Sequence, residues 1–178
     1  MKKILGFSGS NSNKSINQAL IRMAANQVDQ HYITVIELRD YELPIYSPEI
    51  EAKGFPEALL QFKAIFDSHD GYIIASPEHN GMIPALLKNT FDWLSRMVDS
   101  KQGSMFCDKP VLLLSTSPGP RGGVTNLTNM AKVMPFWGAN IINHHSFGRF
   151  HDICQGEFLD EENGEILSKL VTDFQKEF

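Results

Sequence analysis

Three segments of the chain gather hydroxyl, amide and glycine groups, and each of them follows a short apolar run. The first segment, residues 8–18, holds four serines, three asparagines and one glycine. Ser15 and Gln18 have the spacing of a capping box, which predicts that a helix begins near Ser15. The N–H groups and the positive dipole end of such a helix stabilise an anion, so a phosphate fits here. A loop that only caps its helix uses the same residue types, and both interpretations stay open.

The second segment, residues 76–84, is stiffened by prolines around a turn. Pro77 fixes its own φ and favours an extended Ser76, and the pair Asn80-Gly81 tolerates positive φ. Backbone N–H groups that such a turn presents can bond the edge of a planar heteroaromatic ring. A tight connection between two elements is the alternative interpretation.

The third segment, residues 115–123, contains three glycines, two prolines and two serines, which excludes regular structure. Glycines let a backbone approach a ligand closely. Arg121 is the one cation of this segment. It either reaches a phosphate or a neighbouring chain, or lies on the surface without such a role.

These segments need elements to hold them, and the chain alternates short apolar runs with longer amphipathic stretches. Strands are predicted at residues 4–8, 32–38, 72–76, 111–116 and 139–142, and helices at residues 15–30, 55–68, 84–98, 126–133 and 161–176. Runs that are apolar throughout suit strands that are covered on both faces. The alternation therefore predicts an α/β fold: a flavodoxin-like, doubly wound, five-stranded parallel sheet with helices on both faces.

In an open parallel sheet, ligands bind at the carboxyl ends of the strands. The three segments follow the first, third and fourth predicted strands, so they should meet at one edge of the sheet. One segment suits a phosphate, and the other two suit the two sides of a flat ring. Flavin mononucleotide (FMN) has these parts.

The helix at residues 84–98 has an unusually wide apolar face, an arc of about 160° where about 100° suffices for packing on a sheet. The excess indicates either a second apolar partner, such as another subunit, or a helix that is deeply buried in its own chain.

Charge and composition limit the classes of function. The chain has 178 residues and a net charge of −5, which suits one globular domain over residues 1–178. Eight acids but only two bases lie in residues 151–178, and no basic stripe exists, so nucleic acid is not an expected partner. Cys107 and Cys154 are too far apart in sequence for a ligand cluster, so no metal site is expected. No signal-peptide core or long apolar run occurs, so we expect a cytoplasmic protein without a membrane partner.

The three segments together resemble those of the NAD(P)H-dependent FMN reductase family. Its members carry a GSxRxxSxN-type loop, a PEYNGxxPxxLKNxxDWxSR segment and an SxSPGxxGG-type loop, which appear here at residues 9–17, 77–96 and 115–123. The likeness spans most of residues 3–145, and its middle segment is the most specific part.

The resemblance implies FMN as cofactor, NADPH or NADH as electron donor, and a quinone, azo dye, flavin or similar small molecule as acceptor. It also implies a homodimer or homotetramer, paired through helix 84–98. The cofactor-binding residues that it implies are Ser8, Ser10, Ser12, Ser15, Ile16, Asn17, Pro77, Glu78, His79, Asn80, Gly81, Ser117 and Gly119.

Two positions depart from the family's pattern. Ser12 stands where the family has an arginine, so the phosphate must be held by N–H and hydroxyl donors. His79 stands where the family has a tyrosine, and it is the candidate catalytic residue, because an imidazole titrates near neutral pH.

Three other functions compete with a reductase. A flavodoxin-type electron carrier shares the fold, as does a binding module without catalysis. A phosphatase of this fold needs a cysteine nucleophile in a C-x5-R loop, and neither Cys107 nor Cys154 has an arginine six positions on.

Overall fold

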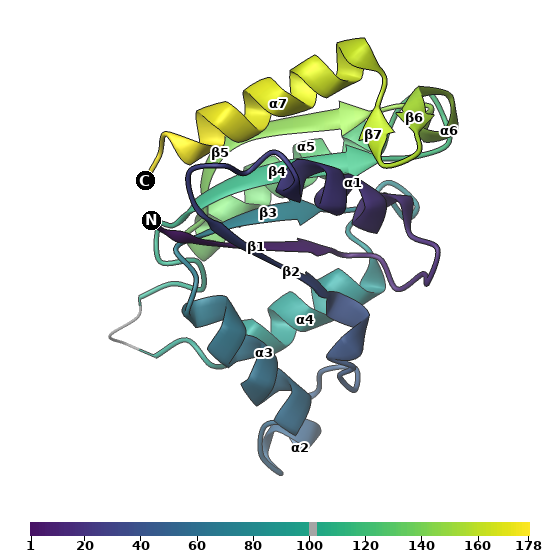
Figure 1. Cartoon of the computed structure of the whole chain (residues 1–178). Coiled ribbons are helices and arrows are strands. Elements are labelled where there is room, and N and C mark those ends of the chain that lie inside the picture. The colour runs from purple at the N-terminus through teal and green to yellow at the C-terminus, as the bar shows by residue number, and fades with distance from the viewer. Residues whose placement is uncertain (100–102) are drawn as a thin grey trace.

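The computed structural model of the chain, which describes residues 1–99 and 103–178, is built around one parallel sheet (Figure 1). Its strands are β1 (Lys3–Ser8), β2 (Tyr32–Glu37), β3 (Gly71–Ala75), β4 (Pro110–Thr116) and β5 (Asn140–Phe147). Their order in the sheet is β2-β1-β3-β4-β5, and every pairing is parallel. The predicted fold class is therefore confirmed.

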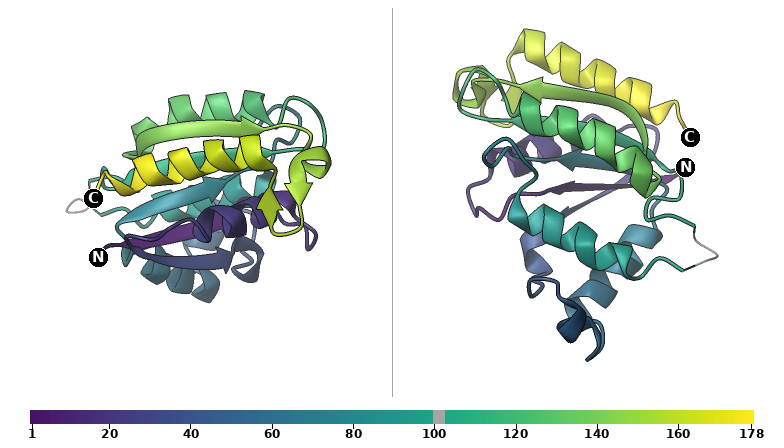
Figure 2. Two further views of the ribbon diagram at one scale, coloured as in Figure 1. Left: turned by 45° about the horizontal axis from the view of Figure 1, so that its top comes forward. Right: turned by 180° about the vertical axis from the view of Figure 1, so that it is seen from behind.

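Five long helices cover the two faces of the sheet (Figure 2). On one face lie α1 (Ile16–Ala25) and α7 (Glu161–Gln175). On the other face lie α3 (Glu57–Asp67), α4 (Ala85–Ser95) and α5 (Val124–Val133). Because both faces are covered, all residues of β3 are buried and the strand can be apolar throughout.

The fifth strand is longer than its sequence predicts, since it runs to Phe147 rather than ending at residue 142. It is an edge strand, and Asn143 and His144 are exposed there. Polar residues at an edge interrupt the apolar run that identifies a central strand. This extension carries the chain to the carboxyl edge of the sheet, where the candidate site lies.

Several short elements were not predicted. These are the 3-10 turns η1 (Leu38–Asp40) and η2 (Met134–Trp137), the helices α2 (Pro48–Glu51) and α6 (Phe150–Ile153), and the small hairpin β6 (Cys154–Gln155) and β7 (Phe158–Leu159). The segment α6-β6-β7 lies at the carboxyl ends of the strands, opposite the two chain termini (Figure 1).

The wide apolar face of α4 is partly covered by the chain itself. Trp93 is fully buried, and its Nε1 donates to the carbonyl of Pro44 at 2.8 Å. The ring of Tyr46 packs edge-on against Trp93, with the centroids 5.2 Å apart. Asn89 adds three bonds to the same segment, because its Nδ2 donates to the carbonyls of Leu43 and Pro44 and its Oδ1 accepts from the N–H of Tyr46. The residues after η1 thus cover part of the wide apolar face, as the second of the two interpretations, burial within its own chain, expects.

The described part of the chain contains no helix that is long and apolar enough to cross a membrane.

Candidate functional site

The loop between β1 and α1 is built from serines that accept backbone hydrogen bonds in a regular series. Ser8 Oγ accepts from the N–H of Ser10, Ser10 Oγ from that of Ser12, and Ser12 Oγ from that of Lys14, each at 3.2 Å. A hydroxyl that accepts in this way still has its own hydrogen to donate. The exposed side of the loop therefore presents O–H donors and is suited to an anion.

The first turn of α1 adds backbone donors to this loop. Ser15 caps the helix as predicted, with its Oγ accepting from the N–H of Gln18 at 3.1 Å. The N–H groups of Ile16 and Asn17 have no partner within the helix, because the first turn lacks the preceding carbonyls. Together with the hydroxyls of Ser10 and Ser12, they gather uncharged hydrogen-bond donors at the start of α1, an arrangement suited to an anion.

The loop after β3 ends in a tight reverse turn. His79 and Met82 exchange two backbone hydrogen bonds, of 3.1 and 3.0 Å, while Asn80 and Gly81 have φ values of 53° and 77°. This is the geometry of a type I′ turn, which requires positive φ at both central residues. Among the bonds of the described residues, none uses the N–H of Asn80 or Gly81. Both groups are therefore available to donate to a ligand.

Glu78 fixes the start of this loop against α5. Its Oε2 accepts from the N–H of Asn126 at 3.0 Å, in the first turn of that helix. The Nδ2 of Asn126 in turn donates to Ser76 Oγ at 2.9 Å and to the carbonyl of Pro77 at 3.0 Å. The carboxylate of Glu78 therefore caps the first turn of α5 and ties the loop to that helix.

The loop after β4 is shaped by its own bonds and by a glycine without packing neighbours. Ser117 Oγ donates to the carbonyl of Gly119 at 3.2 Å. A Cβ on Gly119 meets nothing closer than Ser117 Oγ, at 3.9 Å, and its φ is not in the positive range. Neither backbone geometry nor protein packing demands glycine there, so the open space is available to a ligand.

These three loops line one hollow of about 360 Å³. Of the residues that the resemblance implies, the hollow is lined by Ser10, Ser12, Ser15, Ile16, Asn17, Pro77, Glu78, His79 and Ser117. Asn80 and Gly81 lie at the tip of the reverse turn beside it. Ser8 is buried beneath the loop, 1% exposed, and supports it rather than facing the hollow.

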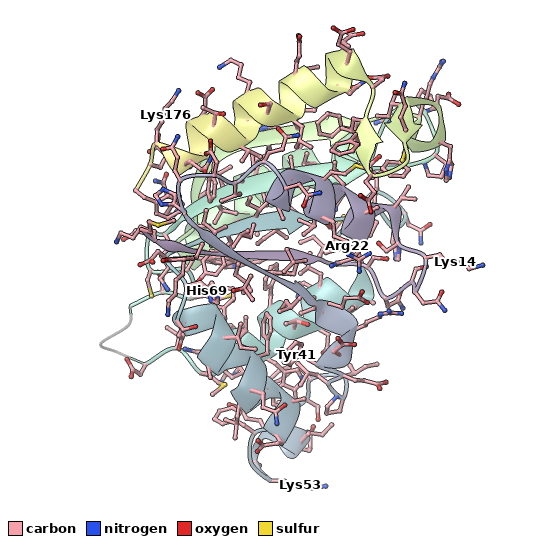
Figure 3. All side chains as sticks on the ribbon, viewed as in Figure 1. Lys14, Arg22, Tyr41, Lys53, His69 and Lys176 are labelled. Carbon is pink, nitrogen blue, oxygen red and sulfur yellow. The ribbon has the colours of Figure 1, made fainter. Side chains whose placement is uncertain are left out.

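Four further residues line the hollow that the sequence did not assign to it: Lys14, Thr116, Pro118 and His151. Three of them adjoin assigned residues. His151 comes from α6, which follows β5. The sequence analysis ended that strand at residue 142, so it did not bring the residues after it to the hollow. Lys14 extends outward from the tip of its loop (Figure 3).

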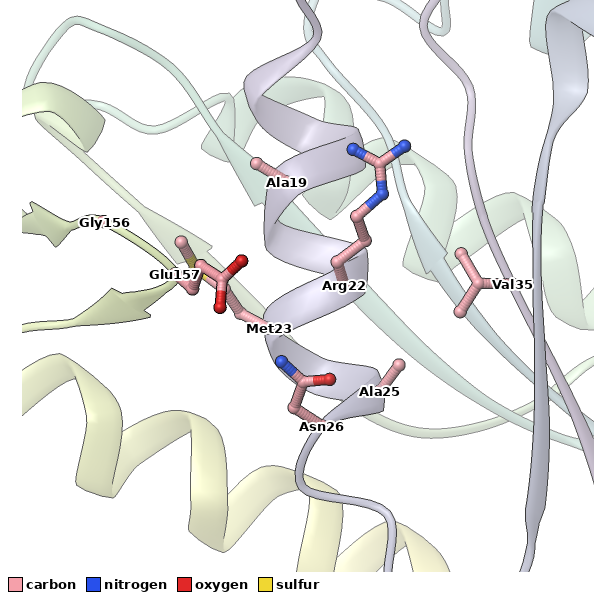
Figure 4. Close-up of a pocket in the computed structure, with 8 residues that line it drawn as sticks. All are labelled: Ala19, Arg22, Met23, Ala25, Asn26, Val35, Gly156 and Glu157. Atoms are coloured by element: carbon pink, nitrogen blue, oxygen red, sulfur yellow. The ribbon is translucent and has the colours of Figure 1, made fainter.

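A second hollow, of about 470 Å³, lies beside the carboxyl-terminal half of α1 (Figure 4). There α1 runs between Glu157 of the β6–β7 hairpin and Val35 of β2. Its one cation, Arg22, pairs with Glu37 at 2.7 Å, and the walls include no helix N-terminus. It is larger than the hollow at the three loops but lacks a comparable set of donors.

The sequence agrees with one protein family over most of its length. The model of the NADPH-dependent FMN reductases matches residues 2–152. The chain belongs to this family. It is 29% identical to an NAD(P)H-dependent FMN reductase of Pseudomonas aeruginosa, over 97% of this chain and 93% of the other. It is 31% identical to an NADPH azoreductase of a Bacillus strain, over 84% and 76% of the two chains.

A solved structure shares the fold. The flavoenzyme FerB of Paracoccus denitrificans, an NAD(P)H:(acceptor) oxidoreductase, superposes with a TM-score of 0.84 at 22% identity, over 99% of this chain and 96% of the other. The family match agrees with the three segments from which the sequence predicted it.

Proposed function

We propose that this protein is an NAD(P)H-dependent oxidoreductase that holds FMN at the three loops and reduces a quinone, an azo compound, a flavin or a similar small molecule. The single observation that carries the proposal is the donor array of the first loop beside a type I′ turn with two available N–H groups. The first can hold a phosphate, and the second can hold the edge of a ring. The family membership supports the same cofactor.

The residues present fit such a group. The hydroxyls of Ser10, Ser12 and Ser15 would hold the phosphate, with the N–H groups of Ile16 and Asn17. The side-chain amide of Asn17 is already used by Thr116, so we assign its backbone N–H alone to the phosphate. The space above Gly119 and the prolines around it would admit the ring.

Bound FMN supplies hydride and electron transfer between a nicotinamide and an acceptor. The protein's own part is to bind and to position. The rigid turn at Asn80 and Gly81 orients the edge of the ring, and the bonds of Glu78 and Asn126 keep that turn in place. Backbone donors of the loop after β4 would stabilise the negative charge that develops on the pyrimidine side of a bound ring.

An electron carrier of the same fold is the second candidate. Carriers dock their redox partners through an acidic surround. Here the described lining of the hollow contains one carboxylate, Glu78, against Lys14 and two histidines, which favours a reductase. A binding module without catalysis would lack turnover altogether.

The reductase is tested by mixing purified protein with FMN and then adding NADPH or NADH without oxygen. We expect the visible flavin band to bleach in seconds with at least one of the nucleotides. Uptake of FMN without bleaching supports the carrier, and no uptake of FMN refutes the proposal. The cytoplasm remains the expected location, since it holds the nicotinamide nucleotides that the reaction consumes.

Pairing of two copies through helix 84–98 remains part of the proposal. Although Trp93 is covered by its own chain, Ile45 and Met82 beside the start of α4 are 85% and 60% exposed. We expect light scattering after gel filtration to give twice or four times the mass of one chain. A monomer at micromolar concentration refutes this part.

A further inference from the structure

His151 reaches the candidate site through a segment that is fixed by backbone contacts. The N–H of Arg149 donates to the carbonyl of Gly119 at 2.8 Å, and the N–H of Phe150 to that of Ser117 at 3.1 Å. Gly148 allows this approach, since a Cβ there would lie 2.3 Å from the carbonyl oxygen of Pro120. The side chain of His151 therefore lines the hollow from the side of β5, on a segment tied to the loop after β4.

The same loop is tied to the first turn of α1. Asn17 exchanges two hydrogen bonds with the backbone of Thr116, of 2.9 and 3.0 Å. Thr116 precedes Ser117, and the carbonyl of Ser117 holds the start of α6. A short series of contacts thus connects the donors at the start of α1 to His151. His151 thus shares one hollow with Ser10, Ser12 and Ser15, the hydroxyls at which the phosphate is expected.

The charges around the hollow leave one cation suited to that position. The chargeable side chains of its described lining are Lys14, Glu78, His79 and His151. Glu78 is bonded to the start of α5, and His79 belongs to the reverse turn. Lys14 extends outward from the tip of its loop (Figure 3). A flavin phosphate carries a charge of about −1.5 to −2, and Lys14 is the one charged side chain of the serine loop.

We propose that His151 is the cationic partner of the phosphate and sets the preference of the site for FMN over riboflavin. This inference rests on the proposed function, because it concerns the same flavin. The imidazolium donates to a phosphate oxygen across the hollow from Ser10, Ser12 and Ser15. It supplies a positive charge to a site in which Ser12 stands in place of the family's arginine.

The proposal gives the affinity for FMN a dependence on pH. An unperturbed imidazole loses its proton near pH 6.5, and a phosphate monoester loses its second near pH 6. The other charged groups facing or adjoining His151 are Lys14, Glu78, His79, Arg149 and Asp152. Lysine, arginine and the carboxylates ordinarily keep their charge between pH 6.5 and 8.5. The affinity for FMN should therefore fall over this range, and the affinity for riboflavin should not.

The test compares FMN with riboflavin in wild type and in His151→Asn, titrated by flavin fluorescence at pH 6.5 and 8.5. At pH 6.5 we expect His151→Asn to bind FMN roughly tenfold more weakly, the effect of losing one charged hydrogen bond. The loss should shrink at pH 8.5, and riboflavin should bind both proteins equally. His151→Lys should keep the preference for FMN at both pH values. His144→Asn, an exposed histidine of β5 outside the hollow, is the control.

Three results overturn the inference. An unchanged affinity of His151→Asn for FMN removes His151 from the phosphate, and an equal loss for riboflavin makes its role structural. A pH dependence of FMN binding that persists in His151→Asn assigns it to another group, and His79→Asn then identifies whether that group is His79. If wild type takes up neither flavin, the proposed function fails as well. If wild type binds and reduces FMN and His151→Asn binds FMN as tightly as wild type does at pH 6.5, this inference alone fails.

Discussion

Asn17 and Thr116 are 99 residues apart in the chain and share two buried hydrogen bonds. The Nδ2 of Asn17 donates to the carbonyl of Thr116 at 2.9 Å, and the N–H of Thr116 donates to Asn17 Oδ1 at 3.0 Å. One amide side chain thus satisfies both backbone groups of a strand end. It also fixes the distance between the start of α1 and the loop after β4, on which a flavin site made of both depends.

Replacing Asn17 by alanine should therefore affect both stability and binding. Two buried backbone groups of Thr116 lose their partner, which costs roughly 1–3 kcal/mol of unfolding free energy. FMN should bind more weakly, because the two loops are no longer held at one spacing. Urea unfolding and FMN titration measure the two effects. Asn13→Ala, an exposed change in the same loop, is the control and should leave stability unchanged. Wild-type FMN affinity in Asn17→Ala would contradict the coupling.

At Gly81, in the reverse turn, the effect of a substitution on stability can be separated from its effect on FMN binding. Gly81→Ala places a Cβ at a φ of 77°, which should cost roughly 1 kcal/mol. Gly54→Ala is the matched control, since Gly54 has a φ of 109° and no packing neighbour, far along the chain from the three loops. Thermal unfolding should show similar losses in both variants. Only Gly81→Ala should weaken FMN binding, and equal FMN affinity in the two variants would remove the turn from the site.

At Gly119 we expect a substitution that weakens FMN binding without lowering the stability of the fold. A Cβ fits there without contact closer than 3.9 Å and without positive φ, so Gly119→Ala should not lower the melting temperature. The methyl group occupies space that we assign to the ring, so FMN should bind more weakly. Isothermal titration with FMN and a thermal melt measure the two quantities. Full FMN affinity in Gly119→Ala would place the ring elsewhere.

The sequence predicted the central part of this structure well and its edges less well. β1, β3 and β4 lie between two layers of helices, so their apolar runs identify them, and the loops at their carboxyl ends follow from that. β5 was cut short at residue 142 because Asn143 and His144 face solvent at the sheet edge. Hydrophobic periodicity detects residues that are buried in a regular pattern, and an edge strand buries few of its residues.

The sequence analysis missed His151, which lines the hollow, for the same reason. With β5 ending early, nothing in the sequence brought residues after it to the three loops. Likewise, the apolar arc of α4 did not show that Pro44 and Tyr46 cover Trp93, since that contact depends on tertiary packing of an irregular segment. The resemblance implied Asn17 as a cofactor-binding residue without saying through which group, and the structure shows that its side-chain amide bonds Thr116. Sequence spacing places a residue near a ligand but does not show which group already has a partner.

His79 should act on the acceptor rather than on flavin binding. Its backbone makes the turn and its side chain is exposed, so His79→Ala should bind FMN as wild type does. We expect reduction by NAD(P)H to be unchanged and transfer to a quinone to slow roughly tenfold or more, because the imidazole no longer donates a proton to the acceptor. Stopped-flow measurement separates the two half-reactions. If both keep their rates, His79 has no catalytic role.

Asp70 makes the stability of the fold depend on pH in the acid range. The N–H of Lys3 donates to its Oδ2 at 2.8 Å and, with the nearby Lys2, holds the pKa of Asp70 below its usual value. A lowered pKa in the folded protein contributes stability that is present above the unfolded pKa and is lost as the pH falls through the folded pKa. Wild type should thus be more stable than Asp70→Asn at pH 7, by up to about 1 kcal/mol, and the difference should shrink as the pH falls into the acid range.

Urea unfolding across this pH range checks the prediction for Asp70. Lys2→Ala is the control for the ion pair, whose atoms are 3.6 Å apart and exposed, and it should change little. A constant difference between wild type and Asp70→Asn from pH 7 to pH 2 would exclude the carboxylate as its cause.

A crystal structure of the protein grown with FMN tests most directly whether the three loops form one flavin site. We expect the phosphate within hydrogen-bond distance of the N–H groups of Ile16 and Asn17, and the edge of the ring against those of Asn80 and Gly81. Flavin found in the hollow beside Arg22 and Glu157 (Figure 4), or found nowhere in crystals grown with excess FMN, would contradict it.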